Sequence, residues 1–169
     1  NMVKTKVYAG QYGAGVEKMA KAAGIEEVEM QRIEDAYNAK FPGVRLFQRK
    51  IINLAEQRLR TEGLPWIRTP YGRKLVADPD KLYTAVNYLI QGHGAEILKR
   101  GMVSIDAAGL GQYLILPVHD ELVLDVPIEE AKDVLHQLEE ILNHLTDYAV
   151  PITWGGDILA DNWGSKYAK

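Results

Sequence analysis

The sequence predicts an α+β fold, in which a helical first part precedes an antiparallel sheet backed by helices. Apolar residues recur at helical spacing through most of residues 1–63. At Leu64-Pro65 the pattern changes to short runs rich in β-branched residues, and two apolar runs flank residues 119–121. The chain has 169 residues and 47% hydrophobic content, enough for one compact domain or two small lobes.

Glycine and proline divide the first part into four predicted helices, at residues 2–12, 16–23, 26–39 and 44–62. Gly13-Ala14-Gly15 ends the first helix, and Gly24 and Gly63 close the second and fourth. Phe41-Pro42-Gly43 separates the third from the fourth. We therefore take residues 1–63 as one segment and residues 64–169 as the other.

The second part combines short strands with two longer helices. Runs at 66–69 and 75–76 flank Pro70-Tyr71-Gly72-Arg73, which predicts a two-stranded ribbon with an exposed turn. A helix is predicted at 80–102 with Asp80 as its N-cap. An amphipathic helix is predicted at 128–147, where it should cover the sheet, and a last strand at 150–154.

The tetrapeptide Val118-His119-Asp120-Glu121 places two adjacent carboxylates between apolar runs at 113–118 and 122–127. These runs predict a β-hairpin with the carboxylates at its tip. Hairpins usually turn on Asn-Gly or Asp-Gly, so His-Asp-Glu favours a chemical role. The alternative is a solvated turn whose charges keep the end of the sheet soluble.

Composition limits the ligands and partners. Zero cysteines exclude disulfides and thiolate metal sites, so oxygen ligands and a hard ion such as Mg²⁺ fit best. A net charge of −3 argues against coating nucleic acid by bulk electrostatics, so local basic patches must carry any such binding. Such residues occur in 45–50, at Arg58 and Arg60, and at Arg68 with Arg73-Lys74, although a charge run is usually a solvated face. Neither a membrane span nor a signal peptide is recognisable, so we expect a soluble protein.

Lys4, Tyr8 and Tyr12 are spaced i, i+4, i+8 and share one face of the first predicted helix. A lysine next to aromatic rings suits a nucleoside triphosphate. Taken alone, this spacing favours the other interpretation, in which the tyrosines are half-buried packing residues and Lys4 is a solvated end.

Four motifs resemble, in order, those of the family A DNA polymerases, the bacterial DNA polymerase I and phage replicative enzymes. Motif B, the O helix of the fingers, is similar to Lys4-Thr5-Lys6-Val7-Tyr8-Ala9-Gly10-Gln11-Tyr12-Gly13. The others are Thr69-Pro70-Tyr71-Gly72-Arg73, Asn87-Tyr88-Leu89-Ile90-Gln91-Gly92 and Val118-His119-Asp120-Glu121-Leu122-Val123-Leu124, the last of which looks like motif C. Residues 157–169 are similar to the family's C-terminal end. Residues 1–63 would then be a fingers segment and residues 64–169 a palm segment.

The resemblance implies template-directed nucleotidyl transfer from a dNTP to a primer 3′ hydroxyl by a two-metal mechanism. Asp120 would be a ligand of the two Mg²⁺ ions, with support from Glu121, and both would be catalytic. Lys4 would bind the triphosphate and assist departure of pyrophosphate. Tyr8 would lie against the sugar and base, where the family has Phe or Tyr and where Tyr tolerates dideoxynucleotides better. Tyr12 would stack near the templating base.

The resemblance also assigns residues to the primer-template DNA: Gly13, Arg73, Asn87, Gln91 and His119. Such contacts test the shape of a base pair more than its sequence. From the residues alone, Asn87 and Gln91 could be a polar pair on a helix surface. It further implies a cytoplasmic location in a bacterial or phage-infected cell.

The chain departs from the family at several places. Tyr83 replaces an arginine, and His93-Gly94-Ala95-Glu96 replaces Thr-Ala-Ala-Asp. Motif A, with the first catalytic aspartate, and the thumb have no counterpart. We therefore expect the C-terminal part of a polymerase, inactive alone, whose partner is an N-terminal segment with thumb and motif A, with or without a nuclease domain. The alternatives are a non-catalytic DNA-binding module and a metal-dependent hydrolase using His93, His119, Asp120 and Glu121.

Overall fold

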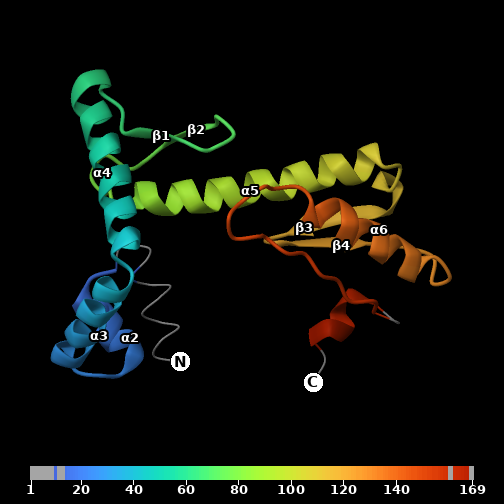
Figure 1. Cartoon of the computed structure of the whole chain (residues 1–169), viewed down its shortest axis with the longest axis horizontal. Helices are drawn as coiled ribbons and strands as arrows, with labels where there is room; N and C mark the ends of the chain where they lie inside the picture. Colours follow the sequence, from blue (N-terminus) through green and yellow to red (C-terminus); the bar gives the residue numbers. More distant parts are fainter. Residues whose placement is uncertain (1–9, 11–13, 160–161, 168–169) are drawn as a thin grey trace. The chain divides into compact units, whose positions relative to one another are not determined.

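The computed structural model describes residues 10, 14–159 and 162–167 (Figure 1). These residues divide into two compact units between His93 and Gly94. This division falls inside a helix and differs from the expected segment boundary at residue 64. The assignment of the two segments to fingers and palm stays a prediction. The α+β class is confirmed, because helices combine with two antiparallel two-stranded sheets. Of the helices in the described ranges, none has the length and apolar content needed to cross a membrane.

Three helices open the described part of the first unit: α2 (Val16–Ala23), α3 (Glu27–Lys40) and α4 (Pro42–Glu62). Each lies within two residues of its predicted range. Gly24 and Gly63 follow α2 and α4 with φ of 69° and 76°, the left-handed conformation that glycine adopts without steric strain. The helix expected at 2–12 lies outside the described residues except for Gly10.

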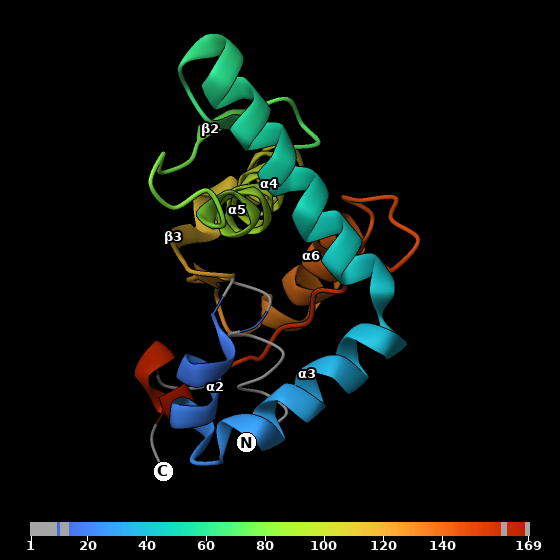
Figure 2. The same ribbon diagram turned by 90° about the vertical axis from the view of Figure 1, so that its left-hand side faces the viewer.

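The helices α2 and α3 pack side by side (Figures 1 and 2). Met19 and Ala20 of α2 and Met30 of α3 are buried against each other and form a small core of their own. Removal of these apolar side chains from water is what stabilises such short helices.

The predicted ribbon is present as β1 (Trp66–Arg68) and β2 (Lys74–Val76), paired antiparallel with Ile67 opposite Leu75. Successive side chains of a strand point to opposite faces. Ile67 is buried with Ala55 of α4 and Leu89 of the next helix, while Leu75 packs against the same core. Trp66, Arg68, Lys74 and Val76 therefore share the other face of the ribbon.

The long helix α5 is Thr84–Ala107, so it begins four residues later than expected and continues beyond residue 102. Asp80 is not its N-cap. Instead, a carboxylate oxygen of Asp78 accepts the backbone N–H of Asp80 at 2.9 Å, and the N–H of Lys81 bonds the carbonyl of Asp78 at 3.0 Å. These local bonds hold a turn that competes with helix.

The second unit contains a hairpin and a covering helix. The strands β3 (Leu114–Val118) and β4 (Glu121–Leu124) pair antiparallel, and Val118 lies opposite Glu121. Helix α6 is Ala131–Asn143, shorter at both ends than the predicted 128–147. Its buried residues Val134, Leu138 and Leu142 form the core with Ile105 and Leu110, and Leu122 and Leu124 of β4 pack against them.

The strand expected at 150–154 is wrong, because this segment is irregular. Asn143 at the end of α6 accepts the backbone N–H of Trp154 at 2.6 Å and donates to the Trp154 carbonyl at 3.2 Å. Both backbone groups of Trp154 are thus paired with a side chain. A short 3₁₀ helix, η2 (Trp163–Tyr167), follows.

Candidate active site

His119 and Asp120 form the two-residue turn between the paired residues Val118 and Glu121. His119 has a φ of 56°, and no other non-glycine residue in the described part of the chain has a positive φ. A positive φ at the first turn position is the sign pattern of a type II′ turn, which normally has glycine there. A positive φ disfavours a residue with a Cβ by about 1–3 kcal/mol. Strain of this kind is typical of functional sites.

Asp120 of the turn and Glu121, the first residue of β4, both line a cavity of about 730 Å³ within the second unit. Asp120 is exposed and Glu121 is half-buried. They supply hard oxygen donors on consecutive residues, the donor type that suits Mg²⁺. In the described ranges, no group of three or more His, Asp or Glu side chains could hold a metal ion. The pair therefore fits part of the ligand set of such an ion.

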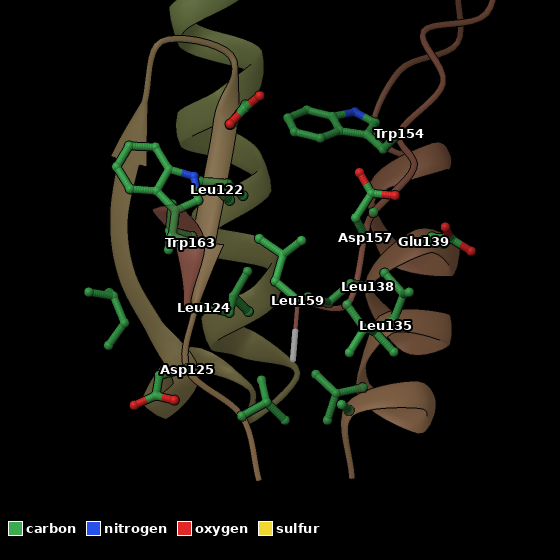
Figure 3. Close-up of a pocket in the computed structure, with 18 of the residues that line it drawn as sticks. Leu122, Leu124, Asp125, Leu135, Leu138, Glu139, Trp154, Asp157, Leu159 and Trp163 are labelled. Carbon is green, nitrogen blue, oxygen red and sulfur yellow. The ribbon is translucent and has the colours of Figure 1, made fainter. Parts of the chain in front are cut away.

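The labelled residues that line this cavity come from β4, α6 and the C-terminal segment (Figure 3), while α5 and β3 each add one isoleucine, Ile105 and Ile115. Leu122 and Leu124 come from β4, Leu135 and Leu138 from α6, and Trp154, Asp157, Leu159 and Trp163 from the C-terminal segment. The described residues that line it include five carboxylates, on Asp120, Glu121, Asp125, Glu139 and Asp157, and no lysine or arginine. The negative potential should favour cations near the tip.

Asp157 was missed by sequence reasoning as a neighbour of this cavity. It lies far from Asp120 in the sequence, in a segment without periodicity that would have placed it. The backbone passes close to α6 here, since a Cβ on Gly156 would lie 2.5 Å from Cδ1 of Leu135. Only the packing of the C-terminal segment on α6 brings this carboxylate to the cavity.

Among the residues assigned to the primer-template, Arg73, Asn87 and Gln91 lie in the first unit. The ribbon packs on α5 beside them, because Leu75 contacts Gly92 so closely that a Cβ there would lie 2.7 Å from Cδ1 of Leu75. The Tyr71 and His93 rings also meet, with centroids 5.0 Å apart. Arg73 is exposed in the ribbon turn, and its backbone N–H bonds the buried hydroxyl of Thr69 at 3.0 Å.

Asn87 has a buried side-chain oxygen for which the described residues offer no hydrogen-bond partner. A buried polar atom without a partner is uncommon and is often completed by a ligand or water. Gln91 follows one turn later on the same helix and is exposed. The structure therefore keeps these two polar residues on neighbouring turns of α5, as their i, i+4 spacing predicts.

The remaining predicted residues of the site lie elsewhere. Lys4, Tyr8, Tyr12 and Gly13 fall outside the described residues. His119 belongs to the second unit, with the carboxylates.

The base of the hairpin is held by a hydrogen bond from the Tyr113 hydroxyl to a Glu130 carboxylate oxygen, at 2.6 Å. This bond raises the pKa of Tyr113 above its ordinary value, because ionisation would remove the donated proton and place a phenolate beside a carboxylate. The contact connects the start of β3 to the residue that precedes α6.

Comparison with known proteins identifies the class. The model of "DNA polymerase family A" matches residues 1–165. The DNA polymerase of Mycobacterium phage D29 is 30% identical over 166 residues, which cover 97% of this chain and 26% of the relative. DNA polymerase I of Pseudomonas aeruginosa is 32% identical over 167 residues, covering 92% of this chain and 18% of the relative.

A solved structure agrees with these sequence matches. It is the POL domain of Pol1 from M. smegmatis in complex with DNA primer-template and dNTP, which covers 89% of this chain at 26% identity and a TM-score of 0.73. This chain covers 28% of that one. The matches place the chain among the DNA polymerases, and within them it belongs to family A. It spans about a quarter of the length of the phage relatives.

Proposed function

We propose that the chain is the C-terminal part of a DNA-directed DNA polymerase, which adds nucleotides from dNTPs to a primer 3′ hydroxyl. The observation that carries the proposal is the pair Asp120 and Glu121, held at a strained hairpin turn and lining a carboxylate-rich cavity. The family match over residues 1–165 supports the reading of this turn as motif C. In this proposal, residues 1–63 form a fingers segment and residues 64–169 a palm segment.

Asp120 and Glu121 would hold Mg²⁺ at the hairpin tip. When bound, a pair of such ions lowers the pKa of the primer hydroxyl and stabilises the charge on the leaving pyrophosphate. Neutralisation of the carboxylate charge by a cation would also relieve the repulsion between adjacent acids. The positive φ of His119 fixes the direction in which the turn presents both side chains.

Residues of the first predicted helix would bind the nucleotide. The ammonium of Lys4 would pair with the triphosphate and give a proton to the departing pyrophosphate. The Tyr8 ring would lie against the sugar and base, and the Tyr12 ring would stack near the templating base.

The polar residues of α5 and of both turns would contact the primer-template. Asn87 and Gln91 each carry amide donors that suit the acceptors present in the minor groove of every base pair. Arg73 and His119 would add contacts from the ribbon turn and the hairpin turn, and Gly13 would give the backbone room. Such contacts read geometry and leave the choice of base to pairing.

Catalysis would require a second segment that supplies the other aspartate, because no motif A residue occurs in this chain. The test mixes the 169-residue chain with an N-terminal polymerase segment that contains motif A, and follows Mg²⁺-dependent extension of a labelled primer. We expect extension only from the mixture. Asp120→Ala should abolish it, whereas the exposed Asp147→Ala should not. Unchanged extension by Asp120→Ala would contradict the proposal, and turnover of phosphoesters by the isolated chain would favour a hydrolase.

A further inference from the structure

An unusual concentration of cations surrounds the ring of Trp66 in the first unit. The guanidinium carbon of Arg58 lies 3.3 Å from the ring centroid, the Lys74 ammonium 4.6 Å and the Arg68 guanidinium carbon 5.3 Å. Cations within about 6 Å of an indole centroid are attracted by its quadrupole. We call Arg58, Trp66, Arg68 and Lys74 the Trp66 cluster.

The secondary structure explains how the cluster is assembled. Arg58 comes from α4, Trp66 and Arg68 are two residues apart on β1, and Lys74 lies directly opposite Arg68 on β2. The other face of the ribbon is buried through Ile67 and Leu75, so Trp66, Arg68 and Lys74 share the solvent face. The guanidinium of Arg58 reaches the indole from α4. Arg68 and Lys74 are both exposed.

Within the described part of the chain, the three cations of the cluster form no ion pair with an acid, and they outnumber the one carboxylate that is hydrogen-bonded to the indole. Arg60 pairs with Glu56 at 2.7 Å and Lys81 with Asp78 at 3.9 Å, but no described carboxylate forms an ion pair with Arg58, Arg68 or Lys74. The carboxylate at the indole belongs to Glu62, which accepts the Trp66 indole N–H at 2.7 Å. Like charges directly opposite on paired strands are destabilising. Arg68 and Lys74 are opposite each other in this way, so their positive charges repel. A bound anion would reduce this repulsion, which favours an anion-binding role for the cluster.

Hydrogen bonds to backbone carbonyls orient the two arginines of the cluster and leave donors for an anion. Arg58 donates to the Trp66 carbonyl at 2.9 Å and Arg68 to the Gly72 carbonyl at 2.7 Å. Each guanidinium has five N–H donors, so each keeps donors for a ligand after one bond orients it. Because Arg58 covers the indole at 3.3 Å, a base would have to displace it to stack there. Phosphate fits the cluster better than a nucleobase does.

We propose that the Trp66 cluster binds the phosphate backbone of a nucleic acid strand, independently of its sequence. This inference rests on the proposed function for its choice of DNA as the polyanion. Because the chain carries a net charge of −3, such binding needs a local basic surface. The cluster lacks the adjacent carboxylates of the hairpin tip, so it holds DNA without taking part in the chemistry.

The test measures binding of the full 169-residue chain to a fluorescein-labelled duplex with a single-stranded template overhang, in two unrelated sequences and over a range of salt. Each phosphate contact contributes about −0.9 to the slope of log K against log salt. The double variant Arg68→Gln/Lys74→Gln should reduce the magnitude of the slope by about 2 for both sequences. Circular dichroism checks that it folds.

The control variant Arg60→Gln/Lys81→Gln removes the same two charges, but from cations that already pair with Glu56 and Asp78. It should change the slope much less. The variant Arg68→Lys/Lys74→Arg keeps both positive charges and should have the slope of the unaltered chain. An equal slope for the Arg68→Gln/Lys74→Gln variant and the unaltered chain would overturn the proposal. If that variant has an equal slope for DNA but loses binding to poly-L-glutamate, the ligand of the cluster is an acidic polypeptide and the proposal is likewise overturned. If primer extension by the two-segment mixture fails while the slope difference persists, the proposed polymerase function fails and the cluster assignment stands.

Discussion

The side-chain amide of Asn143 forms two reciprocal hydrogen bonds with the backbone of Trp154, at 2.6 Å and 3.2 Å. Asn143 is the last residue of α6, and Trp154 begins the C-terminal segment that walls the cavity of Asp120 and Glu121. A strand would pair these backbone groups with a neighbouring strand, but here one side chain does so. The contact thereby fixes the wall of the candidate active site.

Asn143→Leu should release the C-terminal segment. The variant loses both bonds and should lower the free energy of unfolding by about 1–3 kcal/mol, because each such bond contributes about 0.5–1.5 kcal/mol. Chemical denaturation followed by circular dichroism measures the change. Asn143→Asp keeps the acceptor for the Trp154 N–H and should retain part of the stability. Equal stability of Asn143→Leu and the unaltered chain would contradict this role.

The Tyr113–Glu130 hydrogen bond predicts a dependence of stability on pH at the alkaline end. The folded-state pKa of Tyr113 is raised, so the bond contributes fully below the ordinary tyrosine pKa of about 10. Its contribution is lost as the pH rises through the higher folded-state value. In a spectrophotometric titration at alkaline pH, Glu130→Gln should lower the pKa of Tyr113. The Tyr113 signal is identified by its absence from the titration of Tyr113→Phe. A titration curve that Glu130→Gln leaves unchanged would argue against the bond.

The strained turn predicts opposite effects on stability and activity. His119→Gly removes the Cβ that disfavours a φ of 56° and should stabilise the chain by up to about 1 kcal/mol. It should also lower primer extension by the two-segment mixture, because the imidazole that would contact the primer-template is lost. His119→Val should destabilise, since a β-branched residue tolerates this φ poorly. Equal thermal stability of the Gly and Val variants would show that the turn is not strained.

Truncation of the core under the hairpin should destabilise the second unit. Leu138 of α6 is 7% exposed and belongs to the cluster that supports β4. Leu138→Ala should reduce the free energy of unfolding by about 2–5 kcal/mol. The matched control is Val150→Ala, at a residue that is 78% exposed and should cost little. Similar losses for both would place Leu138 outside the core.

The nucleotide-binding role of Tyr8 can be tested by removal of its phenolic hydroxyl. Tyr8→Phe in the two-segment mixture should reduce incorporation of dideoxynucleotides relative to deoxynucleotides, because the phenol is the group that the resemblance links to their acceptance. The ratio of the two incorporation rates is the readout. An unchanged ratio with normal extension would remove Tyr8 from this role.

Local sequence signals predicted much of the fold. Helices α2, α3 and α4 were expected within two residues because glycine or proline marks their ends. The hairpin followed from two apolar runs, and its tip residues Asp120 and Glu121 from the unusual turn composition. The start of α5 was not predictable in this way, because the bond between Asp78 and the N–H of Asp80 favours a turn where a cap was expected.

The sequence by itself determined the α+β fold class, the hairpin and the adjacent carboxylates, since periodicity and local turn chemistry depend on near neighbours. Tertiary structure decided the irregular course of residues 150–154, through Asn143, and the presence of Asp157 at the same cavity as Asp120. It also gathered Arg58, Arg68 and Lys74 around Trp66. These relationships join residues from different elements, and the packing of side chains that sets them leaves no periodic signal along the chain.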